Sequence, residues 1–352
     1  MVELVPETAR TDAIQSFVKQ QTIFVEIEQT DGLKGLGYSY TIGTGGHAVL
    51  ALLRHDLLPV LRDLDAAEIE AVWQRLFWHT HATAVGAITS LALAAIDLAL
   101  WDLRCKSAGL PLCKLAGGAR KRVPVYDTEG GWLHLDTAAL VDGALRAQKA
   151  GWSGVKVKIG KPDPHEDRER IAALRKAVGP AFNLMLDANQ SLTAAEAIRR
   201  ARLLEDLDPF WLEEPLPAED IEGHARLSRA TSIPIAVGES LYALSHFREY
   251  LERGAAAIIQ PDVARIGGIT PWLKAAHLAE AFNVKVAPHF LMEIHVSLSA
   301  AATNAIYVEH IPQLRALTKK GLVIENGMAL APDEPGLGID WDFDQLRARA
   351  GE

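Results

Sequence analysis

Apolar and polar residues alternate near the start of the chain in a pattern that predicts an antiparallel hairpin. Ile23, Val25 and Ile27 alternate with polar residues, and Asp31-Gly32 forms a turn into a second strand over residues 35–42. Apolar residues at helical spacing then predict three helices, over 48–61, 66–78 and 88–106. We therefore expect residues 1–118 to form an α+β domain.

From residue 123 onward, short β-branched runs alternate with amphipathic helices. Eight strands are predicted, at 123–128, 154–159, 182–187, 210–213, 233–239, 257–262, 284–289 and 305–309. Eight strand–helix units in a row favour a TIM-type (β/α) barrel over an open sheet. The predicted fold is therefore α/β, with a modified (β/α) barrel over 119–318. Turn residues break the helical pattern in 319–352, and we expect this C-terminal segment to return to the α+β capping domain.

Composition and charge exclude several classes of protein. With 49% hydrophobic and 23% charged residues, the 352-residue chain can bury a large core. The net charge is −9 and no basic run is present, so we expect no nucleic-acid partner. The most apolar stretch, 85–101, contains Asp97 and is too short to span a membrane. Only two cysteines and no signal-peptide pattern favour a cytoplasmic protein, and we expect a homo-oligomer.

Ionisable residues end seven successive predicted strands. Catalytic groups of such barrels lie at the carboxyl ends of the strands. One charged residue at a strand end is common because loops are exposed to water, but seven in succession indicate a site. In chain order they are Lys156 and Lys158, Asp187, Glu213, Glu239, Asp262, His289 and Glu309.

Three evenly spaced carboxylates predict a metal site. Asp187, Glu213 and Glu239 end adjacent strands, so they meet at one rim and need a counter-ion. Oxygen ligands suit a hard cation, Mg²⁺ or in its place Mn²⁺. Asn189, two residues beyond Asp187, is either a polar contact near the metal or a loop-capping residue.

The other strand ends offer proton-transfer groups. Lys156 and Lys158 share one face of their strand, where a neighbouring cation and desolvation would lower a lysine pKa enough to make it a base. Asp262 and His289 end neighbouring strands and predict a carboxylate–imidazole dyad. Glu309 could donate a hydrogen bond to an oxyanion if it is protonated, or else form a salt bridge to a lysine.

In this order the residues resemble the enolase superfamily, and within it the mandelate racemase subgroup. That subgroup has Lys-x-Lys on the second strand, metal carboxylates on the third to fifth, and an Asp-His dyad on the sixth and seventh. The muconate lactonizing subgroup has a lysine on the sixth strand, where this chain has Asp262-Val-Ala-Arg265. Stretches 41–46, 288–295 and 335–340 also resemble galactarate and talarate dehydratase-like members. The resemblance implies that Mg²⁺ stabilises an ene-diolate formed by a lysine or histidine base.

Racemases and sugar-acid dehydratases of the subgroup share this first step, so the pocket must decide between them. Loops at 10–16, 40–47 and 79–81 are rich in hydrogen-bonding groups and favour a polyhydroxy acid. We therefore expect a hydro-lyase that converts an aldarate or aldonate into a 2-keto-3-deoxy acid. The residues expected to bind this sugar-acid substrate are Lys156, Asn189, Glu309, Arg10 and His47. A second anionic end on the substrate would need Arg10 or Lys19 beside it.

Other functions fit the sequence less well. A racemase or epimerase of a 2-hydroxy acid shares the first step and stays open. A non-catalytic sugar-acid-binding barrel should lack a metal carboxylate or a base, and none is missing. Gly43-x-Gly45-x-x-Ala48 resembles a dinucleotide-binding fingerprint, but the strand before it belongs to a hairpin. A serine hydrolase would need a Gly-x-Ser-x-Gly motif, which the chain lacks.

Overall fold

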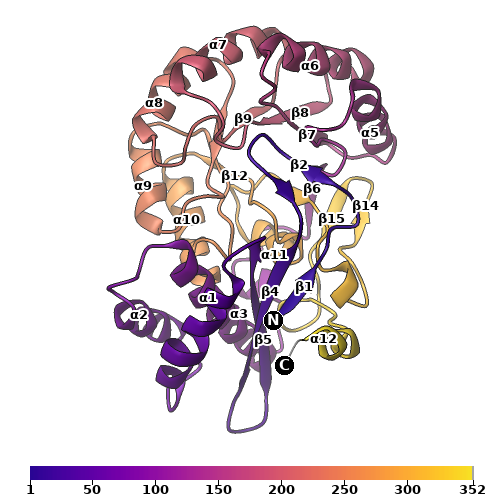
Figure 1. The fold of residues 1–352 in the computed structure, drawn as a ribbon. Helices are drawn as coiled ribbons and strands as arrows, with labels where there is room; N and C mark the ends of the chain where they lie inside the picture. The colour runs from indigo at the N-terminus through magenta and orange to yellow at the C-terminus, as the bar shows by residue number, and fades with distance from the viewer. Residues whose placement is uncertain (351–352) are drawn as a thin grey trace.

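The computed structural model describes residues 1–350 and opens with a capping domain built on a three-stranded antiparallel sheet. The predicted hairpin is confirmed, and it runs the length of the capping domain (Figure 1). The sheet has the order β1, β4, β5, and a short hairpin, β2–β3, connects β1 to β4 along the chain. The strands are β1 (Val2–Leu4), β2 (Arg10–Thr11), β3 (Ser16–Phe17), β4 (Gln20–Glu28) and β5 (Lys34–Ile42).

One buried helix, α3, organises the capping domain. Its apolar and small residues face β5 so closely that a Cβ on Gly37 would lie 2.1 Å from the carbonyl oxygen of Ala95. Glycine is therefore required where the sheet meets the helix. The helices are α1 (Gly46–Leu52), extended by one π turn (Leu53–Leu57) and one 3-10 turn (Leu58–Leu61), then α2 (Ile69–His79), α3 (Ala87–Ser107) and α4 (Leu112–Leu115).

Eight parallel strands form the predicted TIM-type barrel, with helices around its outside (Figure 1). β13 pairs with β6 and an isolated bridge joins β12 to the segment before β13, which closes the ring. The strands are β6 (Arg122–Asp127), β7 (Gly154–Lys158), β8 (Asn183–Asp187), β9 (Trp211–Glu213), β10 (Ile235–Val237), β11 (Ile258–Ile259), β12 (Lys285–Val286) and β13 (Val308–His310). The helices are α5 (Thr137–Lys149), α6 (Pro164–Val178), α7 (Ala194–Leu204) with a 3-10 turn (Glu205–Leu207), α8 (Ile221–Ala230), α9 (Leu244–Glu252), α10 (Ile269–Ala281) and α11 (Met292–Ala301).

The eighth strand departs from the expected repeat, because only a 3-10 turn (Arg315–Leu317) follows it. Pro312 lies two residues after the end of the strand and has no backbone N–H to donate within a helix. The carbonyl oxygen of Pro312 instead accepts a hydrogen bond from Arg10 of the capping domain. This connection therefore joins the two domains rather than completing an eighth helix.

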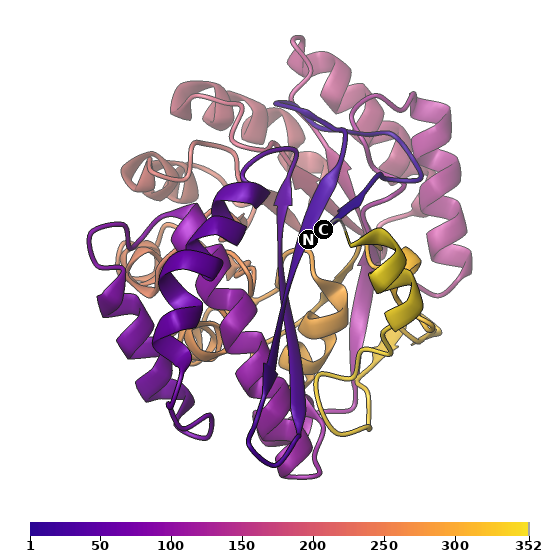
Figure 2. The ribbon, with the colours of Figure 1, turned by 60° about the horizontal axis from the view of Figure 1, so that its bottom comes forward.

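The C-terminal segment reaches both domains, where the sequence predicted only the capping domain. It contains β14 (Ile324–Glu325), β15 (Met328–Leu330) and α12 (Phe343–Arg349). β15 adds antiparallel to β6 of the barrel, with Met328 opposite Pro124. The later part returns as expected: the Trp341 ring lies 5.3 Å from that of Phe24 in β4, and α12 lies beside β1 (Figure 2).

A buried carboxyl group links the capping domain to the barrel. Asp97, in α3, accepts hydrogen bonds from the backbone nitrogen and the hydroxyl of Thr270, at the start of α10. Burial raises the pKa of Asp97 to about 7, against the effect of these hydrogen bonds. Ionisation of Asp97 is therefore costly at this junction.

Two further expectations can be checked in the described chain. Cys105 and Cys113 are both buried free thiols. Within residues 1–350, no helix combines the length and apolar character needed to cross a membrane.

Candidate active site

Three carboxylates meet at the carboxyl ends of β8, β9 and β10, as predicted. Asp187, Glu213 and Glu239 each offer an oxygen atom, and these atoms lie within 4.8 Å of one another. Asp187 and Glu213 are fully buried, and Glu239 is 8% exposed. A set of oxygen donors at this separation fits a hard divalent cation such as Mg²⁺.

Glu213 is the most tightly held member of the three. Its two oxygens accept hydrogen bonds from Lys156 at 2.7 Å, Gln260 at 2.8 Å and Trp211 at 2.9 Å. Burial and the nearby carboxylate of Asp187 together raise its pKa to about 7, against the effect of Lys156. A cation at the three carboxylates would relieve this repulsion, so the residues present fit the metal that the sequence predicted.

Both predicted lysines point into the site from β7. The strand is buried along its whole length, and Lys158 is fixed because its backbone nitrogen donates to the carbonyl of Gly131 at 2.8 Å. Lys156 contacts Glu213 at 2.7 Å and Glu309 at 2.8 Å, while Lys158 donates to Asp187 at 2.5 Å. Neither lysine is a surface residue.

The pKa of Lys158 differs from the expectation. Burial alone lowers it, but the surrounding carboxylates of Asp187, Glu213 and Glu239 together outweigh burial and hold the pKa above its ordinary value. The same balance, dominated by Glu213 and Glu309, raises the pKa of Lys156. Their carboxylate partners therefore keep both lysines charged, which the sequence pattern alone did not reveal.

The Asp262–His289 dyad is present. The carboxylate of Asp262 lies 2.9 Å from Nδ1 of His289, and Tyr40 donates to the same carboxylate oxygen at 2.6 Å. Burial alone lowers the pKa of His289, but Glu239 and Asp262 outweigh it and hold the pKa above the usual value. The dyad therefore fixes the ring and raises its basicity.

Glu309 is an ion-pair partner rather than a proton donor. Burial raises its pKa, but Lys156 outweighs burial and holds the pKa well below the usual range. Its oxygens also accept from the hydroxyl of Thr128 at 2.6 Å and the backbone nitrogen of Phe290 at 2.8 Å. The protonated form considered from sequence is thus disfavoured, and the salt bridge to a lysine is the arrangement found.

One cavity joins these groups to the capping domain. Its floor consists of strand-end residues from the barrel, including Asn189, whose side-chain oxygen is buried and has no hydrogen-bond partner within residues 1–350. The backbone nitrogen of Asn189 also donates to Asp187. Its side-chain oxygen caps no loop in the described chain, so the polar contact near the metal stays a prediction. The rim consists of Asp12, Gln15, Phe17 and Ile42 from the capping domain, with Trp132 and Ile311 from barrel loops.

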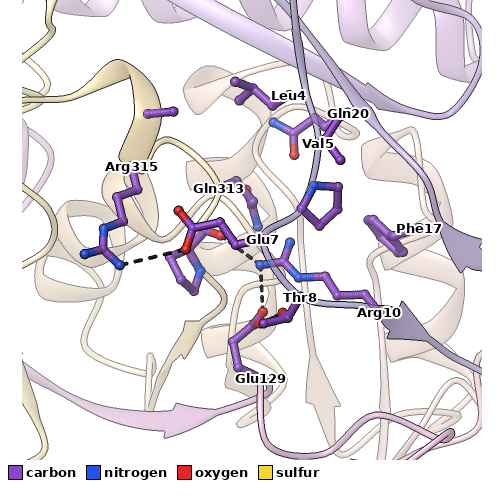
Figure 3. A pocket seen from close by; sticks show the side chains of 13 residues that line it. Leu4, Val5, Glu7, Thr8, Arg10, Phe17, Gln20, Glu129, Gln313 and Arg315 are labelled. Atoms are coloured by element: carbon purple, nitrogen blue, oxygen red, sulfur yellow. Dashed lines mark hydrogen bonds and ion pairs between the residues drawn. The ribbon is translucent and has the colours of Figure 1, made fainter.

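Two predicted substrate-binding residues lie outside this cavity. Arg10 is directed at Glu129, 2.7 Å away, and lines a separate surface pocket (Figure 3). His47 is exposed on the first turn of α1. The loop before it is held against β4, where Gln21 accepts a hydrogen bond from the backbone nitrogen of Gly46. Thr44, His79 and His81 are exposed too and do not line the cavity. Of the three loops that favoured a polyol, only residues 10–16 provide polar lining, through Asp12 and Gln15.

Sequence reasoning missed several residues that shape the site. Tyr40 and Gln260 hold the dyad and Glu213, and Asp12 and Trp132 line the rim. Gln260 lies close in sequence to a residue that was recognised, Asp262, and Tyr40 lies in a loop that was noted, but nothing in the sequence marks either as a contact of the site. Only the folded chain shows which residues they contact.

Comparison with known proteins agrees with this geometry. Residues 2–117 match the mandelate racemase / muconate lactonizing enzyme N-terminal domain, and residues 139–345 match the enolase C-terminal domain-like family. The L-talarate/galactarate dehydratase of Salmonella typhimurium is 38% identical over 317 residues, covering 90% of this chain and 79% of that protein. The 3,6-anhydro-alpha-L-galactonate cycloisomerase of Streptomyces coelicolor is 40% identical over 327 residues, covering 93% and 90%.

A solved structure extends the likeness to the whole fold. The crystal structure of a racemase from Streptomyces coelicolor A3(2) with bound magnesium has a TM-score of 0.95 and 38% identity, covering 99% of this chain and 98% of that one. The chain belongs to the enolase superfamily. Within it, it is an enzyme of the mandelate racemase subgroup, as its strand-end residues indicated.

Proposed function

We propose that this protein is a Mg²⁺-dependent dehydratase that converts a sugar acid into a 2-keto-3-deoxy acid. The observation that carries the proposal is a single buried cavity lined by Lys158, His289 and Glu239, which combines two separate bases with the carboxylate cluster. Relatives named as dehydratases of sugar acids support it.

Mg²⁺ held by Asp187, Glu213 and Glu239 would supply a Lewis acid for the negative charge that develops on the substrate carboxylate. Lys156, at the buried end of the cavity, contributes a fixed positive charge for the same carboxylate. A substrate acid held there presents its α-carbon to the two bases.

Lys158 and His289 provide the proton-transfer groups. The group that faces the α-proton takes it in its neutral form, which a cation held by Asp187 and Glu239 would favour by balancing the carboxylate charge beside Lys158 and His289. The electron pair of the C–H bond moves into the carboxylate to form an ene-diolate. Expulsion of the 3-hydroxyl, protonated by an imidazolium or ammonium group, releases water and leaves an enol, which becomes the 2-keto acid. Asp262 holds the tautomer of His289 throughout.

The similarity to a cycloisomerase supports a second candidate reaction. In a 3,6-anhydro sugar acid, the group on C3 is a ring ether oxygen rather than a hydroxyl. The same α-proton removal and elimination would open the ring without releasing water. A racemase would share only the first step, and the partly polar rim, with Asp12 and Gln15, argues against a purely aromatic substrate.

The test is a panel of aldonic, aldaric and 3,6-anhydro-aldonic acids incubated with Mg²⁺ and followed by semicarbazide detection of 2-keto acid. Mandelate is included, and its optical rotation is monitored in parallel. We expect keto acid from at least one sugar acid and no inversion of mandelate. Rapid mandelate inversion without keto acid from any sugar acid would contradict the proposal and favour the racemase.

A further inference from the structure

The rim of the active-site cavity differs from its floor in charge. A substrate whose carboxylate lies at the metal cluster and Lys156 extends toward the capping domain, so its far end meets the rim. There it meets one carboxylate and one amide, Asp12 and Gln15, and the apolar side chains of Phe17, Ile42, Trp132 and Ile311. Among the described residues that form the rim, none is a cation.

Every cation that lines the cavity belongs to the floor and is already paired. Lys156 and Lys158 contact floor carboxylates, and His289 is bound to Asp262. Arg265, in the loop between β11 and α10, donates to the side chain of Glu239 at 3.2 Å and to the hydroxyl of Tyr40 at 3.1 Å. None of them is left over for a second substrate carboxylate at the rim.

The two cations that could have served a second carboxylate lie elsewhere. Arg10 is bound to Glu129 and to the carbonyl of Pro312, in the separate surface pocket that Figure 3 shows. Lys19 is exposed and pairs with Glu3 at 2.7 Å. Their absence from the cavity removes the charge partner that a dicarboxylic substrate requires.

Asp12 is held in place as a carboxylate at the rim. One of its oxygens accepts hydrogen bonds from the backbone nitrogens of Ile14 and Gln15, both at 2.8 Å, which closes the tip of the β2–β3 hairpin. The side chain is 5% exposed and lies near Lys158. Its other oxygen has no part in these turn hydrogen bonds and can accept from a substrate hydroxyl, whereas a substrate carboxylate would meet like charge.

We infer that this enzyme acts on sugar acids with a single carboxylate, the aldonate class, and that Asp12 selects against dicarboxylic aldarates. The inference rests on the proposed function and narrows its substrate class. It separates this chain from a relative named for talarate and galactarate, which are dicarboxylic acids.

The experiment compares acids that differ only at C6. Galactonate and galactarate, gluconate and glucarate, and mannonate and mannarate are tested as pairs, with kcat/KM measured in saturating Mg²⁺ and Kd measured by calorimetry on the same holoenzyme. For the pair turned over best, we expect the monoacid to be favoured by about tenfold or more, in kcat/KM and in binding, as unscreened like charges in a closed cavity predict.

Asp12→Asn keeps an oxygen for the hairpin turn but removes the charge, so we expect it to raise the diacid's kcat/KM and shrink the preference severalfold. Asp31→Asn is the matched control, because Asp31 caps the exposed turn between β4 and β5 by the same kind of hydrogen bond. That control should leave the ratio unchanged.

Three results would overturn the inference. Diacids could be bound and turned over at least as well as their monoacid partners, which would point to Arg265 as the second carboxylate's partner. The monoacid-to-diacid ratio of kcat/KM could stay constant in folded Asp12→Asn protein. It could also shift by the same factor in Asp31→Asn as in Asp12→Asn. If no sugar acid is turned over, the proposed function is wrong, and the Kd ratio still decides the inference.

Discussion

The floor and the rim of the active-site cavity are built differently, although a substrate would touch both. On the floor, ionisable groups are paired with one another at short range, as Lys156 is with Glu213 and Glu309. The rim has one carboxylate among mainly apolar side chains. The floor has groups that can transfer protons and balance charge. The rim can only favour or disfavour a substrate by its shape and its charge. In the proposed reaction, the barrel floor would therefore decide the chemistry, and the rim, which the capping domain shares with two barrel loops, would decide the choice of substrate.

The largest expected effect comes from removing the metal site in the floor. EDTA should abolish turnover, and Glu213→Gln should reduce kcat/KM by about 10⁴ or more, because the developing dianion loses its counter-charge. Both losses should be the same for every substrate, since the rim is untouched. The measurement is keto-acid formation and Mg²⁺ binding by calorimetry.

Glu219→Gln serves as the control for this prediction. Glu219 is an exposed residue in the loop after the same strand, β9. Normal turnover by fully chelated enzyme would show that the carboxylate cluster is not a catalytic metal site.

The second effect concerns the two bases. Lys158→Met and His289→Asn should each lower turnover by about 10² to 10⁴ for substrates deprotonated from that side, in the range of general base catalysis. Each variant should still exchange the α-proton of the opposite epimer with deuterium, as followed by NMR. Wild-type rates in both variants on every substrate would refute the two-base arrangement.

A third effect tests how the capping domain is fixed over the floor. The pKa of Asp97 is about 7 in the folded chain against 3.8 for the free group, so the folded state binds more protons across that interval. Stability should therefore fall as pH rises from about 4 to about 7, by about 4 kcal/mol at most. Asp97→Asn should flatten this part of the profile relative to wild type.

Urea unfolding at several pH values measures the Asp97 effect. Asp65→Asn is a suitable control, because Asp65 is an acid in the capping domain that bonds only to a nearby backbone nitrogen at the surface. Identical pH slopes in wild type and Asp97→Asn would show that Asp97 does not titrate in this window.

The smallest effect comes from Tyr40, a capping-domain residue that contacts the Asp262–His289 dyad. Tyr40→Phe removes the hydroxyl that donates to Asp262, so kcat should fall about tenfold, as expected for a lost hydrogen bond to a charged group. KM should change little, because Tyr40 does not line the cavity. A shifted acidic limb in the pH profile of substrates that His289 deprotonates would distinguish this role from simple destabilisation. An unchanged kcat would show that the hydrogen bond from Tyr40 does not affect the function of the Asp262–His289 dyad.

The barrel and its floor could be predicted from sequence because both follow from periodicity. A residue such as Glu213 ends a buried strand, and parallel strands in a barrel bring all their ends to one face. The metal carboxylates and the dyad were found in this way. The missing eighth helix was not predicted, because a short irregular segment carries little periodic signal.

The rim could not be predicted in the same way. Which capping-domain side chains enter the cavity depends on how the β2–β3 hairpin and the loop before α1 fold back, and that depends on single contacts such as the Gln21 bond to Gly46. Arg10 and His47 were chosen for their chemistry, but tertiary packing turned them elsewhere. The charges of Lys158 and Glu309 could not be predicted for the same reason, because their pKa values depend on partners that lie far away in the sequence.

The central claim is that the floor removes the α-proton of a sugar acid before the C3 substituent leaves. The most direct test uses a turned-over sugar acid labelled with deuterium at C2, with Mg²⁺ present, and follows label and keto acid together by NMR. The account predicts that the label is released to the solvent in step with keto-acid formation, and that neither occurs in Glu213→Gln. Keto acid that carries the whole label at C3, as an internal shift from C2 would leave it, or keto acid formed at the normal rate by Glu213→Gln, would contradict it.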